Sequence, residues 1–196
     1  ERAPNNANVL LGIGNVKRRK GLLDESIAVQ QEAARLDPLN EDIWVNIGRG
    51  YRGLRRFDEA RRMIDRAHAI APNDLEILAQ QAETYSAQGD LTTAWKILEP
   101  LTFPPTDRGF GTKLSLLVFQ RRFNDAEQLI LTAMGQKDLP PLFIAIGHAS
   151  LAYGHLGNGD RARAEPLLLQ AETELNQVRA AGGDGTLLRN VLLNVE

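Results

Sequence analysis

The clearest pattern of apolar and polar positions lies in residues 41–74. Through residues 43–54, apolar side chains follow the three-to-four residue spacing of one helix face. A short break at 53–56 separates this stretch from a second amphipathic stretch at 57–70, and Pro72 then prevents that helix from continuing. No stretch alternates apolar and polar residues well enough to argue for strands. The pattern predicts two helices joined by a tight turn, within an all-α fold.

The same two-helix pattern recurs along the chain with a period close to 34 residues. Tyr51 and Tyr85 lie 34 residues apart, and so do Pro38 and Pro72. A short unit that opens with leucine or phenylalanine also recurs, and its first residues, 34, 34 and 32 positions apart, are Leu23, Phe57, Leu91 and Phe123. A shared period of this length is typical of solenoids, in which stacked units bury a continuous core.

Small residues keep the same period on both helices of a pair. On the first helices they are Gly14, Gly48 and Ala82, and on the second helices they are Ser26, Ala60 and Ala94. Packed helix axes lie about 8–10 Å apart, depending on the size of the side chains at the contact. We therefore expect these positions to face one another where two helix backbones come close.

Residues 41–74 resemble a tetratricopeptide repeat in almost every characteristic position. The matching residues are Trp44, Ile47, Gly48, Tyr51, Phe57, Ala60, Ala67 and Pro72. Residues 7–40 match less completely, with Lys17 where the family prefers tyrosine, and the match weakens toward the C-terminus, where Leu114 replaces the small residue. The resemblance implies an all-α solenoid, a right-handed superhelix of antiparallel helix pairs.

The resemblance also divides the chain into about five repeats within a single domain, residues 1–196. The approximate repeats are 7–40, 41–74, 75–106, 107–138 and 139–181. Residues 182–196 are rich in glycine and then turn apolar, and we interpret them as a partial repeat or cap. Because the chain begins without methionine and ends in an apolar run, we expect it to be a piece of a longer, bacterial protein.

One segment breaks the repeating composition. Residues 99–111 hold three prolines and two glycines, which favours a loop or a bend between two halves of the solenoid. Helical periodicity resumes directly after it, so we favour a bend over a domain boundary.

Proteins of the resembled family generally hold peptides on the concave face that their first helices form. By resemblance, the groove residues are Leu11, Asn15, Arg18, Asn46, Arg49, Arg52, Gln80, Glu83 and Ser86. Two of these, Asn15 and Asn46, match the asparagines of the family's carboxylate clamp, but Leu11 replaces a clamp lysine and Glu76 lies among the basic positions. We therefore reject a carboxylate clamp and predict general recognition of a peptide or protein. Charge reversal of Arg49 and Arg52 should then weaken capture of the partner with little change in melting temperature.

Charge and composition reduce the classes of partner that the sequence predicts. The chain has 23 Lys and Arg against 25 Asp and Glu, a formal charge of −2, so we do not expect a nucleic-acid partner. Residues 1–72 carry a net charge of +3 and residues 73–196 a net charge of −5, which could orient an acidic peptide toward the first repeats. No apolar run is long enough to span a bilayer, so we expect no membrane insertion.

The sequence favours a non-catalytic module without a cofactor or metal. It has no cysteine, and His148 and His155 are two helical turns apart, about 10.5 Å along a helix, too far to share a metal unaided. Two alternatives remain: a regulatory or sensing appendage of a larger nucleotide cyclase or kinase, or a scaffold in envelope or polysaccharide assembly. The apolar residues 191–195 could also pair two copies of the chain. The compartment stays open, with the cytoplasm slightly favoured over the periplasm.

Overall fold

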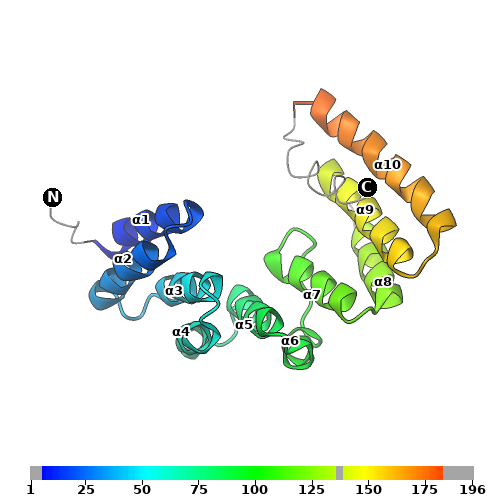
Figure 1. Cartoon of the computed structure of the whole chain (residues 1–196). Coiled ribbons are helices and arrows are strands. Elements are labelled where there is room, and N and C mark those ends of the chain that lie inside the picture. The colour runs from blue at the N-terminus through cyan, green and yellow to red at the C-terminus, as the bar shows by residue number, and fades with distance from the viewer. Residues whose placement is uncertain (1–5, 136–138, 183–196) are drawn as a thin grey trace. The chain divides into compact units, whose positions relative to one another are not determined.

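The computed structural model describes residues 6–135 and 139–182, which form ten α-helices and no strand (Figure 1). The chain divides into two compact units, which we call unit 1 (residues 1–103) and unit 2 (residues 104–196). The helices of unit 1 are α1 (Ala7–Arg19), α2 (Leu23–Leu36), α3 (Glu41–Gly53), α4 (Phe57–Ile70), α5 (Leu75–Gln88) and α6 (Leu91–Leu98). Those of unit 2 are α7 (Arg108–Phe119), α8 (Phe123–Met134), α9 (Pro141–Gly157) and α10 (Arg161–Ala180).

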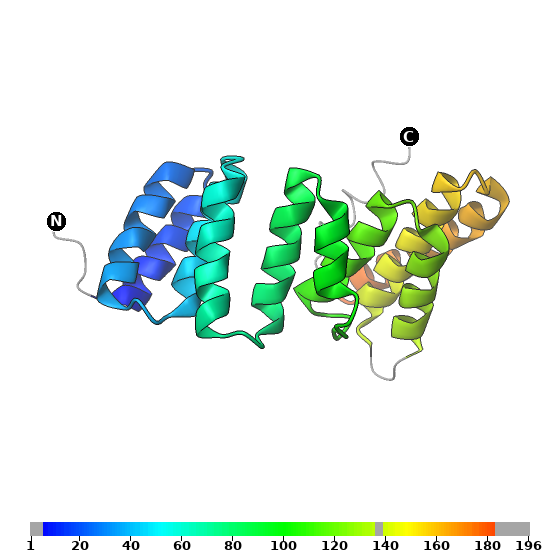
Figure 2. The ribbon, with the colours of Figure 1, turned by 90° about the horizontal axis from the view of Figure 1, so that it is seen from below.

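Unit 1 is built from three helix pairs in two layers (Figure 2). Each odd-numbered helix packs against the even-numbered helix that follows it, and each pair packs against the next. In addition, α1 contacts α3 and α3 contacts α5, so the three first helices lie side by side. We call α1, α3 and α5 the first-helix layer. This arrangement confirms the all-α solenoid of helix pairs that the 34-residue period predicts.

Side chains from the preceding loops fix where several helices begin. Oδ1 of the Asn6 side chain accepts hydrogen bonds from the backbone N–H groups of Asn8 and Val9, at 3.0 and 3.2 Å. The Asp90 carboxylate accepts one from the backbone N–H of Thr93 at 3.0 Å. Each cap satisfies an N–H group that has no partner inside its own helix.

Small residues lie where the two helices of a pair cross, as the sequence predicts. The Ser26 hydroxyl on α2 donates to the backbone oxygen of Gly14 on α1 at 2.8 Å. A Cβ atom at Gly48 on α3 would lie 2.7 Å from Cδ1 of Ile64 and 3.3 Å from the backbone oxygen of Ala60, both on α4. These distances are shorter than ordinary van der Waals contacts, so a larger residue at Gly48 would force the helices apart.

The turn inside each helix pair contains one residue with a positive φ angle. These residues are Gly21, Arg55, Gly89, Arg121 and Gly159, with φ between 57° and 93°. Glycine adopts this left-handed conformation without steric cost, whereas arginine does not. The turn geometry is therefore repeated in all five pairs, although two of them carry a residue that it does not suit.

Unit 2 consists of α7 to α10, joined in sequence by contacts between successive helices. Residues 99–107 form the loop before α7, so the predicted loop is confirmed for its three prolines. The predicted loop is wrong for Gly109 and Gly111, which lie inside α7. The predicted single domain stays a prediction, and the predicted partial repeat, apart from residue 182, falls outside the described residues. None of the described helices is both long and apolar enough to cross a membrane.

Candidate functional site

The first-helix layer of unit 1 carries all nine residues of the predicted groove. Leu11, Asn15 and Arg18 belong to α1, and the corresponding residues of α3 are Asn46, Arg49 and Arg52. Helix α5 contributes Gln80, Glu83 and Ser86. On each helix the three residues are three or four positions apart, a spacing that puts side chains on one helix face.

Two ion pairs join α3 to α5 across this layer. The Arg49 guanidinium pairs with the Glu76 carboxylate. One turn along, Nη2 of Arg52 lies 2.7 Å from Oε2 of Glu83. The other terminal nitrogen of Arg52 donates to the Thr84 hydroxyl and to the backbone oxygen of Gln80, both at 3.4 Å. The side chains of Arg52 and Glu83 are about one-fifth exposed, so this pair is only partly screened by solvent.

Two of the predicted groove residues lie below this charged surface. Asn46 is 5% exposed, and its amide donates to the backbone oxygen of Asp42 on its own helix at 2.8 Å. Gln80 is fully buried, and its amide donates to Glu76 at 3.0 Å. Within the described residues, Oδ1 of Asn46 and Oε1 of Gln80 have no hydrogen-bond partner. Both amides therefore support the layer from beneath, and the arginines and glutamates above them reach solvent.

On α1, the polar residues of the layer are also partly engaged. Oδ1 of Asn15 accepts a hydrogen bond from the amide of Gln30 on α2 at 3.2 Å. Leu11 and Arg18 are half-buried on either side of Asn15. Ser86, at the end of α5, is also half-buried. These four residues are partly exposed to solvent in the same layer as the two ion pairs.

The ion pairs neutralise the charge that Arg49 and Arg52 would otherwise present to a partner. Arg49 and Arg52 do not present unbalanced positive charge, because each faces a glutamate of the next repeat. Charge reversal of both arginines would place four carboxylates together between α3 and α5. Like charges at such short distance destabilise a fold, so the expectation of an unchanged melting temperature no longer follows from the structure.

Two of the three histidines, His148 and His155, lie near carboxylates of neighbouring helices in unit 2. Nδ1 of His148 on α9 lies 2.8 Å from the carboxylate of Glu174 on α10. Nε2 of His155 lies 3.7 Å from the carboxylate of Glu127 on α8. Within the described residues, no three His, Asp or Glu side chains converge closely enough to hold a metal ion.

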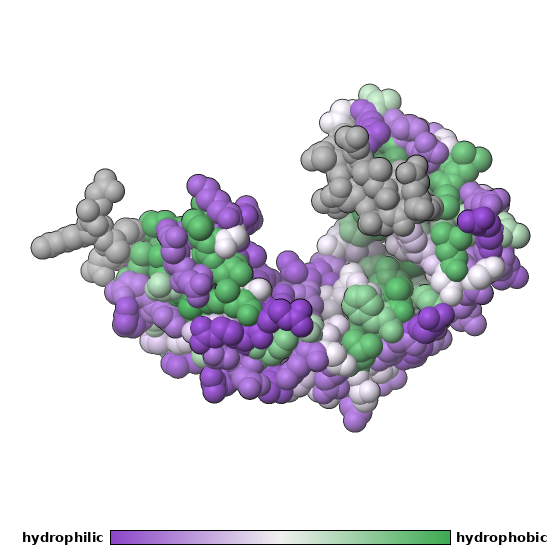
Figure 3. Space-filling view, in the orientation of Figure 1, coloured by the Kyte–Doolittle hydropathy of each residue, from purple (hydrophilic) through white to green (hydrophobic). Residues whose placement is uncertain are grey.

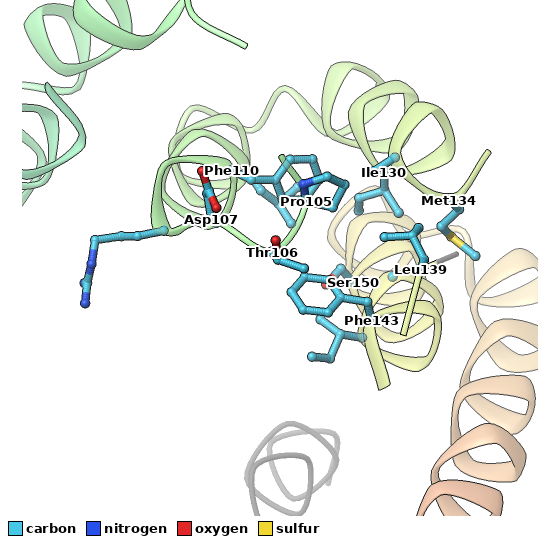
Figure 4. A pocket seen from close by; sticks show the side chains of 15 residues that line it. Pro105, Thr106, Asp107, Phe110, Ile130, Met134, Leu139, Phe143 and Ser150 are labelled. Carbon is cyan, nitrogen blue, oxygen red and sulfur yellow. The ribbon is translucent and has the colours of Figure 1, made fainter. Parts of the chain in front are cut away.

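Unit 2 contains an apolar pocket that the sequence does not predict (Figure 4). Its volume is about 200 Å³, and it lies between α7 and α9 with α8 beneath it. The side chains around it include Pro105, Phe110, Ile130, Met134, Leu139 and Phe143. Apart from Pro105 and Leu139, which lie in loops, these residues look like ordinary solenoid core in the sequence, and only the spacing of the helices shows that the space among them is open.

Comparison with known proteins agrees with this architecture. A family model described as "Tetratricopeptide repeat" matches residues 7–38. The match covers one predicted repeat, and the chain has the fold of a tetratricopeptide-repeat solenoid. No curated protein matches it at a significant level.

Several solved structures of tetratricopeptide repeat proteins share the fold. MamA from Desulfovibrio magneticus superposes with a TM-score of 0.67 at 16% identity, over 87% of this chain and 96% of MamA. YrrB, described as having an unusual peptide-binding site, gives a TM-score of 0.58 at 14% identity, over 87% of each chain. Cut9, in its hetero-tetramer with Hcn1, gives 0.68 at 14% identity, over 88% of this chain and 34% of Cut9.

Proposed function

We propose that unit 1 is a protein-interaction module that binds an extended segment of a partner protein along its first-helix layer. The observation that carries this proposal is the two partly exposed ion pairs between α3 and α5, in a layer in which α1, α3 and α5 lie side by side. A packed solenoid needs only apolar contacts between its repeats, so a row of partly exposed charged groups there is available for recognition. The similarity of fold to YrrB, which is described as having an unusual peptide-binding site, supports peptide binding as the role of unit 1.

The chemistry of the layer indicates what kind of segment it would accept. Each arginine and its glutamate form a locally neutral pair, so the surface offers donors and acceptors side by side. An extended backbone, which also alternates donors and acceptors, can bond to such a surface without matching a particular sequence. A partner with mixed charge fits better than a strongly acidic one, because an acidic segment would have to displace Glu76 and Glu83 from their arginines.

A charge exchange tests the proposal without breaking the fold. In the variant R52E/E83R the attraction between the two positions is retained while the polarity of the surface is inverted. We expect the full chain carrying this exchange to retain its melting temperature and to lose most partners that the unaltered chain captures in a quantitative proteomic pull-down. The matched control is Arg62→Glu, an exposed position on α4 outside the first-helix layer.

The controls separate failure of the fold from failure of recognition. If the exchange and the Arg62→Glu variant retain the same partners as the unaltered chain, the first-helix layer is not the binding surface. If both variants lose the partners equally, the effect is not specific to the first-helix layer, and the proposal is again wrong.

A further inference from the structure

Helix α1 carries a row of exposed apolar side chains. Val9 is 47% exposed, Ile13 37% and Val16 53%. At 100° per residue, these three side chains fall within an arc of about 60° on the helix, and the predicted groove residues of α1 fall on the opposite side. Figure 3 shows hydrophobic residues at the surface of unit 1 over α1. We call Val9, Ile13 and Val16 the α1 stripe.

The same three positions of the next first helix, α3, are buried. The residues 34 positions after the α1 stripe are Ile43, Ile47 and Gly50. The two isoleucines are completely buried, and Gly50 is buried as well. The second helix of the preceding pair contributes to this cover, because a Cβ atom at Gly50 would lie 2.7 Å from Cγ1 of Ile27 on α2. The α1 stripe is therefore the surface on which the repeat pattern packs another helix.

Basic side chains lie at the C-terminal end of α1, next to the stripe. Lys17, Arg18 and Arg19 occupy the last turn, Lys20 follows, and α1 contains no acidic residue. Lys17 pairs with Glu25 at 2.5 Å. Within the part of the chain that the structure describes, Arg19 and Lys20 are exposed and take part in no ion pair. The stripe therefore ends in positive charge that the neighbouring helices leave unpaired.

Helix α2, which packs against α3, shows which chemistry fits such a face. Its first turn contains Asp24 and Glu25. The same turn lies beside the C-terminal end of α3, because a Cβ atom at Gly53 would be 3.0 Å from Cδ1 of Leu23. The acidic turn is thus next to the last turn of α3, which holds Arg52. Acidic groups stabilise the start of a helix and basic groups its end, so the antiparallel arrangement suits the charges of both helices.

We propose that the α1 stripe binds an amphipathic helix of a partner protein, which begins with acidic residues and runs antiparallel to α1. Aliphatic side chains one turn apart on this helix cover the stripe, and its acidic first turn meets Arg19 and Lys20. The bound helix continues the stack of repeats in the way that α2 packs against α3. Because the stripe and the predicted groove residues are on opposite sides of α1, this binding is separate from the function proposed for unit 1.

The charges of the described helices favour a different protein over a second copy of this chain. Two α1 stripes placed against each other would bring together two basic helix ends without an acidic residue in either α1, and like charges at an interface are unfavourable. The second helices with an acidic first turn, α2, α4 and α8, are already packed against the first helices that follow them. The first turns of α6 and α10 hold no acidic residue, and α10 begins with Arg161 and Arg163.

A peptide with the sequence of α2 is a direct probe of the stripe, because α2 already covers the equivalent face of α3. The probe is a fluorescein-labelled peptide of residues 22–37, in which a lactam between Ala28→Lys and Glu32 holds the helix. Titration with the full chain, followed by fluorescence anisotropy, should show saturable binding. We expect Val16→Asn to weaken this binding about tenfold or more. The control Leu131→Asn, at an apolar position of unit 2 that is 46% exposed, should leave it unchanged.

Charge reversal tests the acidic turn separately. We expect the peptide with Asp24→Lys and Glu25→Lys to bind the unaltered chain about fivefold more weakly, and Lys20→Glu in the chain to weaken binding of the original peptide to a similar degree. The reversed peptide should bind the Lys20→Glu chain better than it binds the unaltered chain. Circular dichroism checks that each chain variant keeps its helices and its melting temperature.

Each alternative gives a different result. Absence of saturable binding to the unaltered chain would overturn the proposal, and so would equal losses with Val16→Asn and Leu131→Asn. Equal binding of the original and the charge-reversed peptide would show that acidic residues are not recognised, which also contradicts it. A dimer of the chain that Val16→Asn dissociates, measured by analytical ultracentrifugation, would assign the stripe to a second copy instead.

Discussion

Close packing at the helix crossings makes a sharp prediction about two glycines in the first helices of unit 1. Gly12 and Gly48 both lie in the interior of a 13-residue helix, α1 and α3 respectively. A Cβ atom at Gly12 would meet nothing within 4 Å, whereas one at Gly48 would lie 2.7 Å and 2.9 Å from two carbons of Ile64. Ile64 is fully buried, so it cannot move into solvent to make room.

The gain in helix propensity and the cost of overpacking together decide whether each substitution stabilises or destabilises unit 1. Replacing an interior helix glycine with alanine stabilises the helix by about 0.8–1 kcal/mol, and this gain applies to both positions. Overpacking a filled core costs about 1–3 kcal/mol, and this cost applies only at Gly48. We therefore expect Gly12→Ala to raise the free energy of unfolding by up to about 1 kcal/mol. Gly48→Ala should leave it unchanged or lower it by up to about 2 kcal/mol.

Urea unfolding followed by tryptophan fluorescence measures this difference in unit 1, because both tryptophans, Trp44 and Trp95, belong to it. Relative to the unaltered chain, the urea midpoint should rise for Gly12→Ala and should stay the same or fall for Gly48→Ala. The dependence of the unfolding free energy on urea concentration should be similar in all three proteins. The substitution Ile64→Val removes the nearer carbon, so it should cost less in the Gly48→Ala background than in the unaltered chain. Equal stabilisation by both alanines would refute the crossing argument, and so would strict additivity with Ile64→Val.

Three further predictions follow from other features. Arg55→Gly should stabilise unit 1 by about 0.5–1 kcal/mol, because relief of the left-handed backbone outweighs the loss of the Arg55 contact with the Phe57 ring at 5.7 Å; a lower urea midpoint would contradict this. The hydrogen bonds from Thr93 lower the pKa of the Asp90 carboxyl in the folded chain. The ionised carboxylate therefore stabilises the fold fully above the unfolded-state pKa near 3.9. This stabilisation is lost as the pH falls through the lower folded-state pKa. Asp90→Ala should accordingly lower the melting temperature at pH 7, and the difference from the unaltered chain should narrow in acid. A double-mutant cycle of Arg52→Ala and Glu83→Ala should give a coupling energy of about 1 kcal/mol, and a value of zero would show that the pair is fully screened.

The sequence predicts most of the fold because its repeating positions have a single physical cause. Gly48 and Ala60 recur because backbones meet at each crossing, and Pro72 recurs because a helix must end there. The left-handed turn conformation was not predicted, because arginine rarely adopts it and Arg55 occupies that position in the second repeat. Only an alignment of Arg55 with Gly21 and Gly89 indicates that the position favours glycine. Nearest-neighbour packing in a solenoid makes such local patterns sufficient for the architecture.

The candidate site was harder to predict, because its properties depend on which side chains meet across helices. Arg52 and Glu83 are 31 positions apart, and their pairing follows only from the register of α3 against α5. The pocket of unit 2 depends on a distance between α7 and α9 that no single residue encodes, and it is visible only once the helices are placed.

The two units therefore present different chemistry on corresponding helices. In unit 1, the first helices touch, and their exposed side chains form neutral ion pairs that offer both donors and acceptors. In unit 2, the first helices stand apart over an apolar pocket, which a polar segment would not enter. A partner segment bound along unit 1 would thus gain little from the pocket, and an apolar segment in the pocket would gain little from the ion pairs.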